Sequence, residues 1–173
     1  MLEEEVEKKV STGILTSKKN KELNIMDSNT QFIKAKNSLI RKLGRDPLDN
    51  FQIDEVGKAW FGVKWGFVSD QSKTIPKTPD RYYIVNTAHS NKSPGYHWTA
   101  LYISKSGRPY IYDSFARNVK ALMPVLEKNI KGRGVGVNSN GAEQHSQSSL
   151  CGHISLAWLY VVKNLGIREA SKI

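Results

Sequence analysis

The chain has 173 residues, enough for one domain with a substantial core and too few for two of ordinary size. Lysine and arginine number 26 against 16 aspartate and glutamate residues, a formal net charge of +10, and 39% of the residues are hydrophobic. This composition argues against general disorder, and the charge favours polyanionic partners such as nucleic acid. We expect neither a signal peptide nor a membrane partner, because the N-terminus is acidic and no apolar run reaches transmembrane length.

The sequence predicts an N-terminal extension, residues 1–27, followed by one domain, residues 28–173. The extension has early glutamates and a later lysine cluster without a sustained apolar period, so we expect it to be partly helical or disordered. Ser28-Asn29-Thr30 then fits the cap of a helix that Gly44 ends. The apolar residues with helical spacing are Phe32, Ile33, Leu39, Ile40 and Leu43.

The stretch that follows this helix is harder to interpret. Residues 46–50 have the composition of a turn. Residues 51–67 are rich in aromatic side chains but follow neither a helical nor a strand period. Pro76 and Pro79 make residues 73–79 a predicted loop.

Three segments rich in β-branched and aromatic residues predict the strands of a sheet. They cover residues 81–87, 97–104 and 110–113. The turn sequence Ser106-Gly107-Arg108-Pro109 joins the last two segments, so we expect them to form an antiparallel hairpin.

The C-terminal part alternates helix and strand. Residues 116–130 have a helical period that Pro124 is expected to kink or divide, and residues 134–138 predict a short strand. An apolar helix is then expected from Cys151 through Val162. Together the elements predict an α+β fold in which a small, mostly antiparallel sheet packs against the Cys151 helix.

Cys151 is the only cysteine, so it cannot form an internal disulfide, which fits a reducing environment. Ser148 and Ser149 fit an N-cap, so the thiol is expected at the start of a helix. Unpaired N–H groups and the helix dipole stabilise a thiolate there and can receive an oxyanion. A lone cysteine is more often a buried structural residue, so its interpretation depends on the surrounding side chains.

His97 and Asp113 are candidates for the base and the acid of a catalytic triad. His97 begins one strand of the predicted hairpin and Asp113 ends the other, so the two are expected to lie side by side. An aspartate that accepts a hydrogen bond from Nδ1–H would leave Nε2 to face the thiol. Taken alone, Asp113 fits turn chemistry in the sequence Asp113-Ser114-Phe115 better than a catalytic role.

Other polar residues near Cys151 are weaker or undecided candidates. His153 lies two positions along the helix and is expected to point away. His89 and His145 lie in polar loops and are candidates for the general base only if His97 is not the base. Gln144 and Gln147 each carry an amide that can donate to an oxyanion, although loop glutamines are usually solvated.

Several motifs carry a resemblance to a known family. They are Leu39-Ile40-Arg41-Lys42-Leu43-Gly44, Trp65-Gly66-Phe67-Val68-Ser69, Ile84-Val85-Asn86-Thr87-Ala88, Gly95-Tyr96-His97-Trp98-Thr99-Ala100, Tyr112-Asp113-Ser114-Phe115, and Gln144 seven residues before Cys151-Gly152. Spread over roughly residues 29–165, they resemble the adenovirus endopeptidase (adenain) family, with related maturation proteases in virophages and polinton-type elements.

The resemblance implies a single-domain cysteine protease of the adenain and ubiquitin-like-protease type. It implies Cys151 as the nucleophile, His97 as the general base, and Asp113 in the place of the triad acid, which is usually glutamate in the adenovirus enzyme. Gln144 is implied as the oxyanion donor, ahead of Gln147 because of its spacing.

The resemblance also bears on cofactors and partners. The chemistry itself requires no cofactor. The adenovirus enzyme is stimulated by DNA and by a disulfide-linked viral peptide; Cys151 is committed to catalysis, so a peptide activator here would bind noncovalently. DNA stimulation and an ordinary solvated basic face are equally consistent with these residues: Lys34, Lys36, Arg41, Lys42, Lys128, Lys131 and Arg133.

The function implied by the resemblance is cleavage of viral capsid and structural precursor polypeptides near glycine-containing motifs, in the virion and the host-cell interior (cytoplasm, viral factory or nucleus). The motif at residues 130–134 favours a tight turn between helix and strand, and self-cleavage between Arg133 and Gly134 is the alternative hypothesis. One alternative is a ubiquitin-like-modifier protease or acyltransferase of the same clan. Another is a nucleic-acid-binding virion protein with a vestigial triad.

Overall fold

The computed structural model describes residues 27–88, 97–130, 136–138, 142–145 and 148–173. The predicted extension lies outside these ranges except for Asp27, as do His89, Gln147 and the motif between Lys131 and Gly134. Predictions that concern those residues stay predictions.

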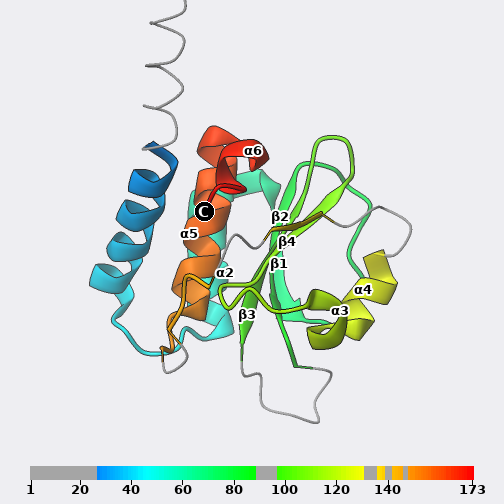
Figure 1. Ribbon diagram of the computed structural model, residues 1–173, viewed down its shortest axis with the longest axis horizontal. Helices are drawn as coiled ribbons and strands as arrows, with labels where there is room; N and C mark the ends of the chain where they lie inside the picture. The colour runs from blue at the N-terminus through cyan, green and yellow to red at the C-terminus, as the bar shows by residue number, and fades with distance from the viewer. Residues whose placement is uncertain (1–26, 89–96, 131–135, 139–141, 146–147) are drawn as a thin grey trace, which may run out of the picture.

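The described residues form helices and five strands, of which the first four follow one another along the chain without a helix between them (Figure 1). A first helix covers residues 27–43. The remaining helices are α2 (Asn50–Phe61), the short 3-10 helix η1 (Gly62–Lys64), α3 (Val119–Leu122), α4 (Pro124–Ile130), α5 (Cys151–Leu165) and α6 (Ile167–Ala170). The strands are β1 (Trp65–Asp70), β2 (Arg81–Asn86), β3 (Trp98–Ile103), β4 (Pro109–Tyr112) and β5 (Gly136–Asn138).

The five strands form one sheet in the order β1-β2-β3-β4-β5. The two central pairs, β2–β3 and β3–β4, are antiparallel, whereas β1 pairs with β2 and β4 pairs with β5 in parallel. The α+β class is confirmed, but the expectation of a mostly antiparallel sheet is wrong. Both outer strands are reached by connections long enough to carry the chain back along the sheet, and these make parallel neighbours.

Helices cover both faces of the sheet (Figure 1). On one face, α5 packs against β3 and β2, with α2 beside it and the helix of residues 27–43 further out. On the other face, α3 and α4 cover a separate cluster of buried side chains that includes Val85, Leu101 and Met123. The two clusters follow the alternation of side chains along each strand.

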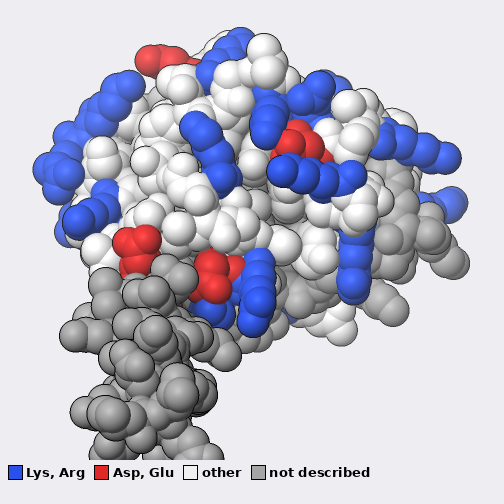
Figure 2. Space-filling view, turned by 90° about the horizontal axis from the view of Figure 1, so that it is seen from above, with Lys and Arg blue, Asp and Glu red and all other residues white. Residues whose placement is uncertain are grey.

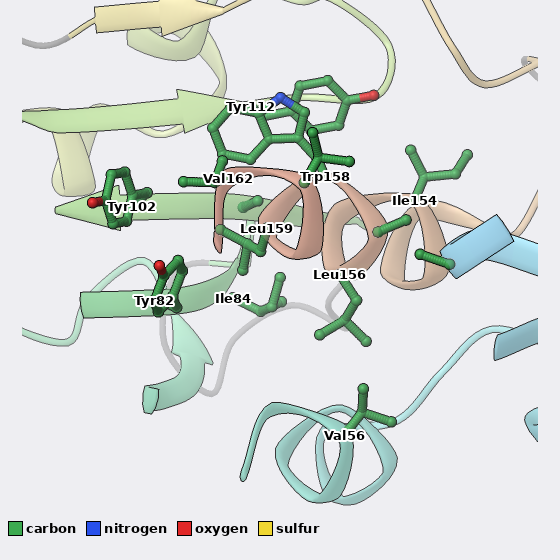
Figure 3. Close-up of a cluster of buried hydrophobic side chains, with 14 of the residues drawn as sticks. Val56, Tyr82, Ile84, Tyr102, Tyr112, Ile154, Leu156, Trp158, Leu159 and Val162 are labelled. Carbon is green, nitrogen blue, oxygen red and sulfur yellow. The ribbon is translucent and has the colours of Figure 1, made fainter. Parts of the chain in front are cut away.

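The core on the α5 face is built around a pair of stacked aromatic rings. Trp158 of α5 lies on Tyr112 of β4 with ring centroids 5.1 Å apart and planes only 8° from parallel. On another side of α5, Leu156 faces Val56 of α2 (Figure 3). The apolar run that predicted this helix is therefore apolar nearly all round because sheet and helices surround it.

Local signals explain where several helices begin and end. Gly44 ends the first helix as predicted, with a φ of 85° and its N–H donating to the carbonyl of Ile40. The aromatic-rich stretch resolves into α2 and β1, and α2 begins with a capping box between Asp49 and Gln52. Pro124 divides the predicted helix of residues 116–130 into α3 and α4.

Two predicted helix caps are wrong. The first helix already includes Asp27, so Ser28 lies inside it and is buried. The N-cap of α5 is Leu150, without a capping side chain. Ser149 instead donates its hydroxyl to the carbonyl of Arg45, and Ser148 accepts from the N–H of Leu150 just outside the helix.

Replacing Gly57 with alanine is expected to destabilise the domain by about 1–3 kcal/mol. A methyl group there would meet the Trp65 indole at 2.2 Å, although alanine is otherwise the better helix former. Trp65 is held in place because its Nε1–H donates to Asp54 at 2.8 Å. Urea unfolding measures the change. Glu55→Ala, at an exposed position of α2, is the control and is expected to stay within about 0.5 kcal/mol of wild type.

Candidate active site

His97 and Asp113 are in contact at one end of the hairpin. His97 Nε2–H donates to Asp113 Oδ1 at 2.5 Å, and the two side chains are 4% and 2% exposed. The carbonyl of His97 accepts from the N–H of Thr87, so the strand ladder also fixes the backbone at this residue. The predicted proximity is confirmed, but the predicted ring nitrogen is wrong: Asp113 takes Nε2, which leaves Nδ1 available for a thiol.

Cys151 is the first residue of α5 and reaches His97 across the sheet end. Its side chain is 7% exposed, and the thiol hydrogen-bonds to the His97 ring and to the backbone N–H groups of Trp98 and Gly152. Burial by itself raises the pKa of a thiol, but here these hydrogen bonds and the nearby imidazole outweigh it and lower the pKa of Cys151. The environment therefore favours the thiolate.

The same contacts act on the histidine in the opposite direction. Burial lowers the pKa of an imidazole because it disfavours the charged form, yet the hydrogen bonds to Asp113 and Cys151 dominate and raise the pKa of His97. A raised histidine pKa beside a lowered cysteine pKa shifts the proton equilibrium from the thiol toward the imidazole.

Asp113 stays ionised although it is buried. Burial raises the pKa of a carboxyl group, but hydrogen bonds from His97 and Arg117 outweigh this and hold the pKa of Asp113 well below its usual range. Arg117 Nε and its backbone N–H both donate to Asp113 Oδ2 at 3.0 Å. Sequence reasoning missed Arg117; its spacing of four residues from an aspartate after a strand was the available signal.

A tight turn after β4 brings Arg117 back to Asp113. Ala116 has a φ of 53°, a left-handed conformation uncommon for alanine, and its N–H donates to the carbonyl of Asp113. Phe115 contacts both His97 and Arg117: its ring centroid is 5.0 Å from that of His97 and 4.8 Å from the Arg117 guanidinium carbon. Asp113 thus serves both the turn and the histidine.

Gln144 is buried and tied to the residue after Asp113. Ser114 donates its hydroxyl to Gln144 Oε1 at 2.6 Å, and its carbonyl accepts from the N–H groups of Glu143 and Gln144. Gln144 Nε2 donates to the carbonyl of Ser148 at 2.5 Å, three residues before Cys151. Because an amide nitrogen carries two hydrogens, a second donor remains on Gln144 near the start of α5.

Two further histidines belong to the described residues. His153 is buried, and its Nε2 lies 3.0 Å from the carbonyl of Gly44, so it joins α5 to the end of the first helix, as its predicted direction away from the site requires. His145 is exposed.

A groove of about 560 Å³ opens beside the thiol. It is lined by Cys151, His97 and Trp98, by the ends of β1 and β2, and by the segment that leads into α2. Gly152 allows this segment to come close, because a Cβ there would lie 3.2 Å from Leu48. The groove is not an enclosed cavity, so it can admit part of a polypeptide chain.

A second groove, of about 810 Å³, lies between the first helix and the far end of α5 and contains neither Cys151 nor His97. Its lining combines basic and aromatic side chains, among them Lys34, Arg41, Trp60 and Tyr160. Lysine and arginine side chains are also spread over the face seen in Figure 2, where acidic ones are few.

Within the described ranges, no group of three or more His, Cys, Asp and Glu side chains is arranged to hold a metal ion. None of the helices described combines the length and apolar character needed to cross a bilayer. Compared with models of known protein families and with curated protein sequences, the chain matches none.

Alkylation of Cys151 by iodoacetamide is expected to persist well below pH 8.5, the usual pKa of a free thiol. In His97→Ala the imidazole is lost while burial remains, so the thiol pKa rises and the rate near pH 6 falls roughly tenfold for each unit of that rise. Rates against pH, read by intact mass, measure this. His145→Ala should keep the wild-type profile; identical profiles for wild type and His97→Ala would contradict the pairing.

Acid is expected to destabilise the wild type more steeply than Asp113→Asn. The folded pKa of Asp113 lies below the unfolded value of about 3.9, so its stabilisation is complete above that pH and is lost as the pH falls toward the folded pKa. The difference between pH 5 and pH 2 is on the order of 2 kcal/mol. Urea unfolding at stepped pH measures it, Glu55→Gln should follow the wild-type slope, and parallel slopes for wild type and Asp113→Asn would exclude the assigned ion pair.

Proposed function

We propose that the chain is a cysteine endopeptidase that uses a Cys151–His97–Asp113 triad. The observation that carries the proposal is the continuous hydrogen-bonded series from the thiol through the imidazole to an ionised, buried carboxylate. A structural cysteine has no need of a histidine that is itself held by an aspartate and an arginine. The open groove beside the thiol supports an extended polypeptide as the substrate.

The proposed reaction begins with transfer of the thiol proton to His97 Nδ1. The thiolate attacks the peptide carbonyl carbon, and the new C–S bond leaves a negative charge on the carbonyl oxygen. When the C–N bond breaks, the imidazolium gives its proton to the leaving amine. Water, deprotonated by His97, then hydrolyses the thioester and regenerates the thiol. Asp113 and Arg117 position the imidazole throughout and keep its charge stabilised.

The oxyanion is assigned to the N–H of Cys151 and the second amide hydrogen of Gln144. Both donors are fixed before substrate binds: one belongs to the first turn of α5, and the other side chain is held by Ser114 and Ser148. Donors that are already oriented stabilise developing charge without reorganisation.

The biological role that we propose is maturation of viral capsid and structural precursors, in the virion or the host-cell interior. It is supported by the order and spacing of the adenain-like motifs around His97, Asp113, Gln144 and Cys151. DNA is a candidate partner because of the basic excess and the spread of basic side chains over one face (Figure 2).

The direct test is hydrolysis of quenched fluorescent peptides with glycine-containing centres, and of a ubiquitin-like modifier with a C-terminal Gly-Gly reporter. Wild type should cleave the peptides, and Cys151→Ala should cleave neither substrate. Preference for the modifier would reassign the protein within the clan. If wild type cleaves neither, with or without DNA, the endopeptidase proposal is wrong.

Replacing Gln144 with alanine is expected to lower kcat by about 10²–10³-fold with little change in KM. Iodoacetamide alkylation needs a thiolate but forms no oxyanion, so its rate should stay close to wild type. Ser114→Ala, which removes one anchor of Gln144 but keeps its donors, is the control and should lose far less activity. Equal losses of alkylation and hydrolysis in Gln144→Ala would show a purely structural role.

A further inference from the structure

Three residues lie in one row across the end of the sheet that borders the groove. Asp70 of β1 pairs with Asn86 of β2, and Asn86 pairs with Trp98 of β3. All three line the groove that contains Cys151, and the N–H of Trp98 donates to the thiol. With strands about 4.8 Å apart, Asp70 lies roughly 10 Å from Trp98 along this row.

Asn86, in the middle of the row, offers an unused donor. Its side chain is 6% exposed, and its Oδ1 accepts from the N–H of Ala88 at 2.8 Å. Among the residues that the structure describes, its Nδ2 has no hydrogen-bond partner. A nearly buried amide donor at the wall of a groove fits a ligand that brings an acceptor, and a peptide carbonyl is such a group.

Two carboxylates also line the groove. Asp70 Oδ1 accepts from the N–H and hydroxyl of Ser72, and Asp49 Oδ1 accepts from the N–H of Gln52 as the cap of α2. Each carboxylate keeps a second oxygen, and no lysine or arginine in the described ranges forms an ion pair with either. Lys73, near Asp70 in sequence, lies over the Phe67 ring instead.

Negative charge in this groove contrasts with the net charge of +10 on the whole chain. The general field of such a protein repels cationic ligands, so two carboxylates without cationic partners beside the thiol create a local exception. Together with the donor of Asn86, they describe a surface for a polypeptide whose side chains carry positive charge.

We propose that this groove selects polypeptides with a lysine or arginine near the scissile bond, one of them facing Asp70. The inference rests on the proposed endopeptidase function. An extended peptide advances about 3.3 Å per residue, so the distance of roughly 10 Å between Asp70 and Trp98 places that basic side chain about three residues from the scissile bond. Asp49, which also lines the groove, favours a second positive charge in the same segment.

The test is a positional library of quenched peptides around a Gly-Gly centre, with lysine, glutamine or glutamate placed singly at each position on both sides. Wild type is expected to show about fivefold higher kcat/KM for lysine than for glutamine at a position about three residues from the cleaved bond, and lower values for glutamate. Added salt should reduce the preference.

Two isosteric variants localise the effect. Asp70→Asn keeps an acceptor for Ser72, and Asp49→Asn keeps an equally good helix cap, so both should fold. Asp70→Asn should abolish the lysine preference at this position, so that the variant cleaves the lysine and glutamine peptides with similar kcat/KM, and Asp70→Lys should reverse the preference in favour of glutamate. Glu55→Gln removes an exposed charge from another part of α2 and should leave the preference intact.

The possible failures are distinguishable. Cleavage of lysine and glutamine peptides at equal rates, or a preference that survives in Asp70→Asn and Asp49→Asn, would overturn this inference and leave the endopeptidase proposal standing. An absence of any cleavage by wild type, while Cys151→Ala and wild type behave alike, would overturn both.

Discussion

The stacking of Trp158 on Tyr112 sets the geometry on which the candidate site depends. Trp158 lies seven residues, about two helical turns, after Cys151, and Tyr112 immediately precedes Asp113. One apolar contact therefore fixes the thiol and the carboxylate relative to each other, while the strand ladder fixes His97 between them. Because the interior is closely packed, the helix cannot slide along the sheet without breaking this contact. The packing of buried aromatic side chains, which take no part in the proposed reaction, therefore positions the thiol, the imidazole and the carboxylate.

Local signals in the sequence were sufficient for the hairpin and for the contact between His97 and Asp113. A short turn between two strands determines that the start of one lies beside the end of the other, whatever the rest of the fold. Local signals were not sufficient to predict the pairing of the outer strands β1 and β5, because their parallel pairing depends on the path of long connections. The choice of Nε2 over Nδ1 could not be predicted either, since it depends on the rotation of a side chain within a packed site.

In the turn after β4, the motif Asp113-Ser114-Phe115 has both a structural role and a role in the candidate site. Asp113 accepts backbone N–H groups in the turn, as the sequence Asp-Ser-Phe predicts, and also binds the histidine. Ser114, which looked like an ordinary turn residue, holds Gln144. Arg117 was missed because its spacing of four residues from Asp113 becomes a contact through a turn in which Ala116 adopts a left-handed conformation. The segment from Asp113 to Arg117 thus organises the site through contacts that depend on the conformation of this turn.

The environment of Cys151 also makes its thiol sensitive to oxidation. The environment of Cys151 favours the thiolate, and the thiolate is also the form of cysteine that peroxides oxidise most readily, first to a sulfenic acid. In many redox-tolerant proteins a neighbouring thiol then closes a disulfide, which reducing agents can reopen. This chain has no second cysteine, so a sulfenic acid at Cys151 can proceed to the irreversible sulfinic acid unless a small external thiol reaches it first. The redox state of the surroundings therefore limits how long such a site stays reactive.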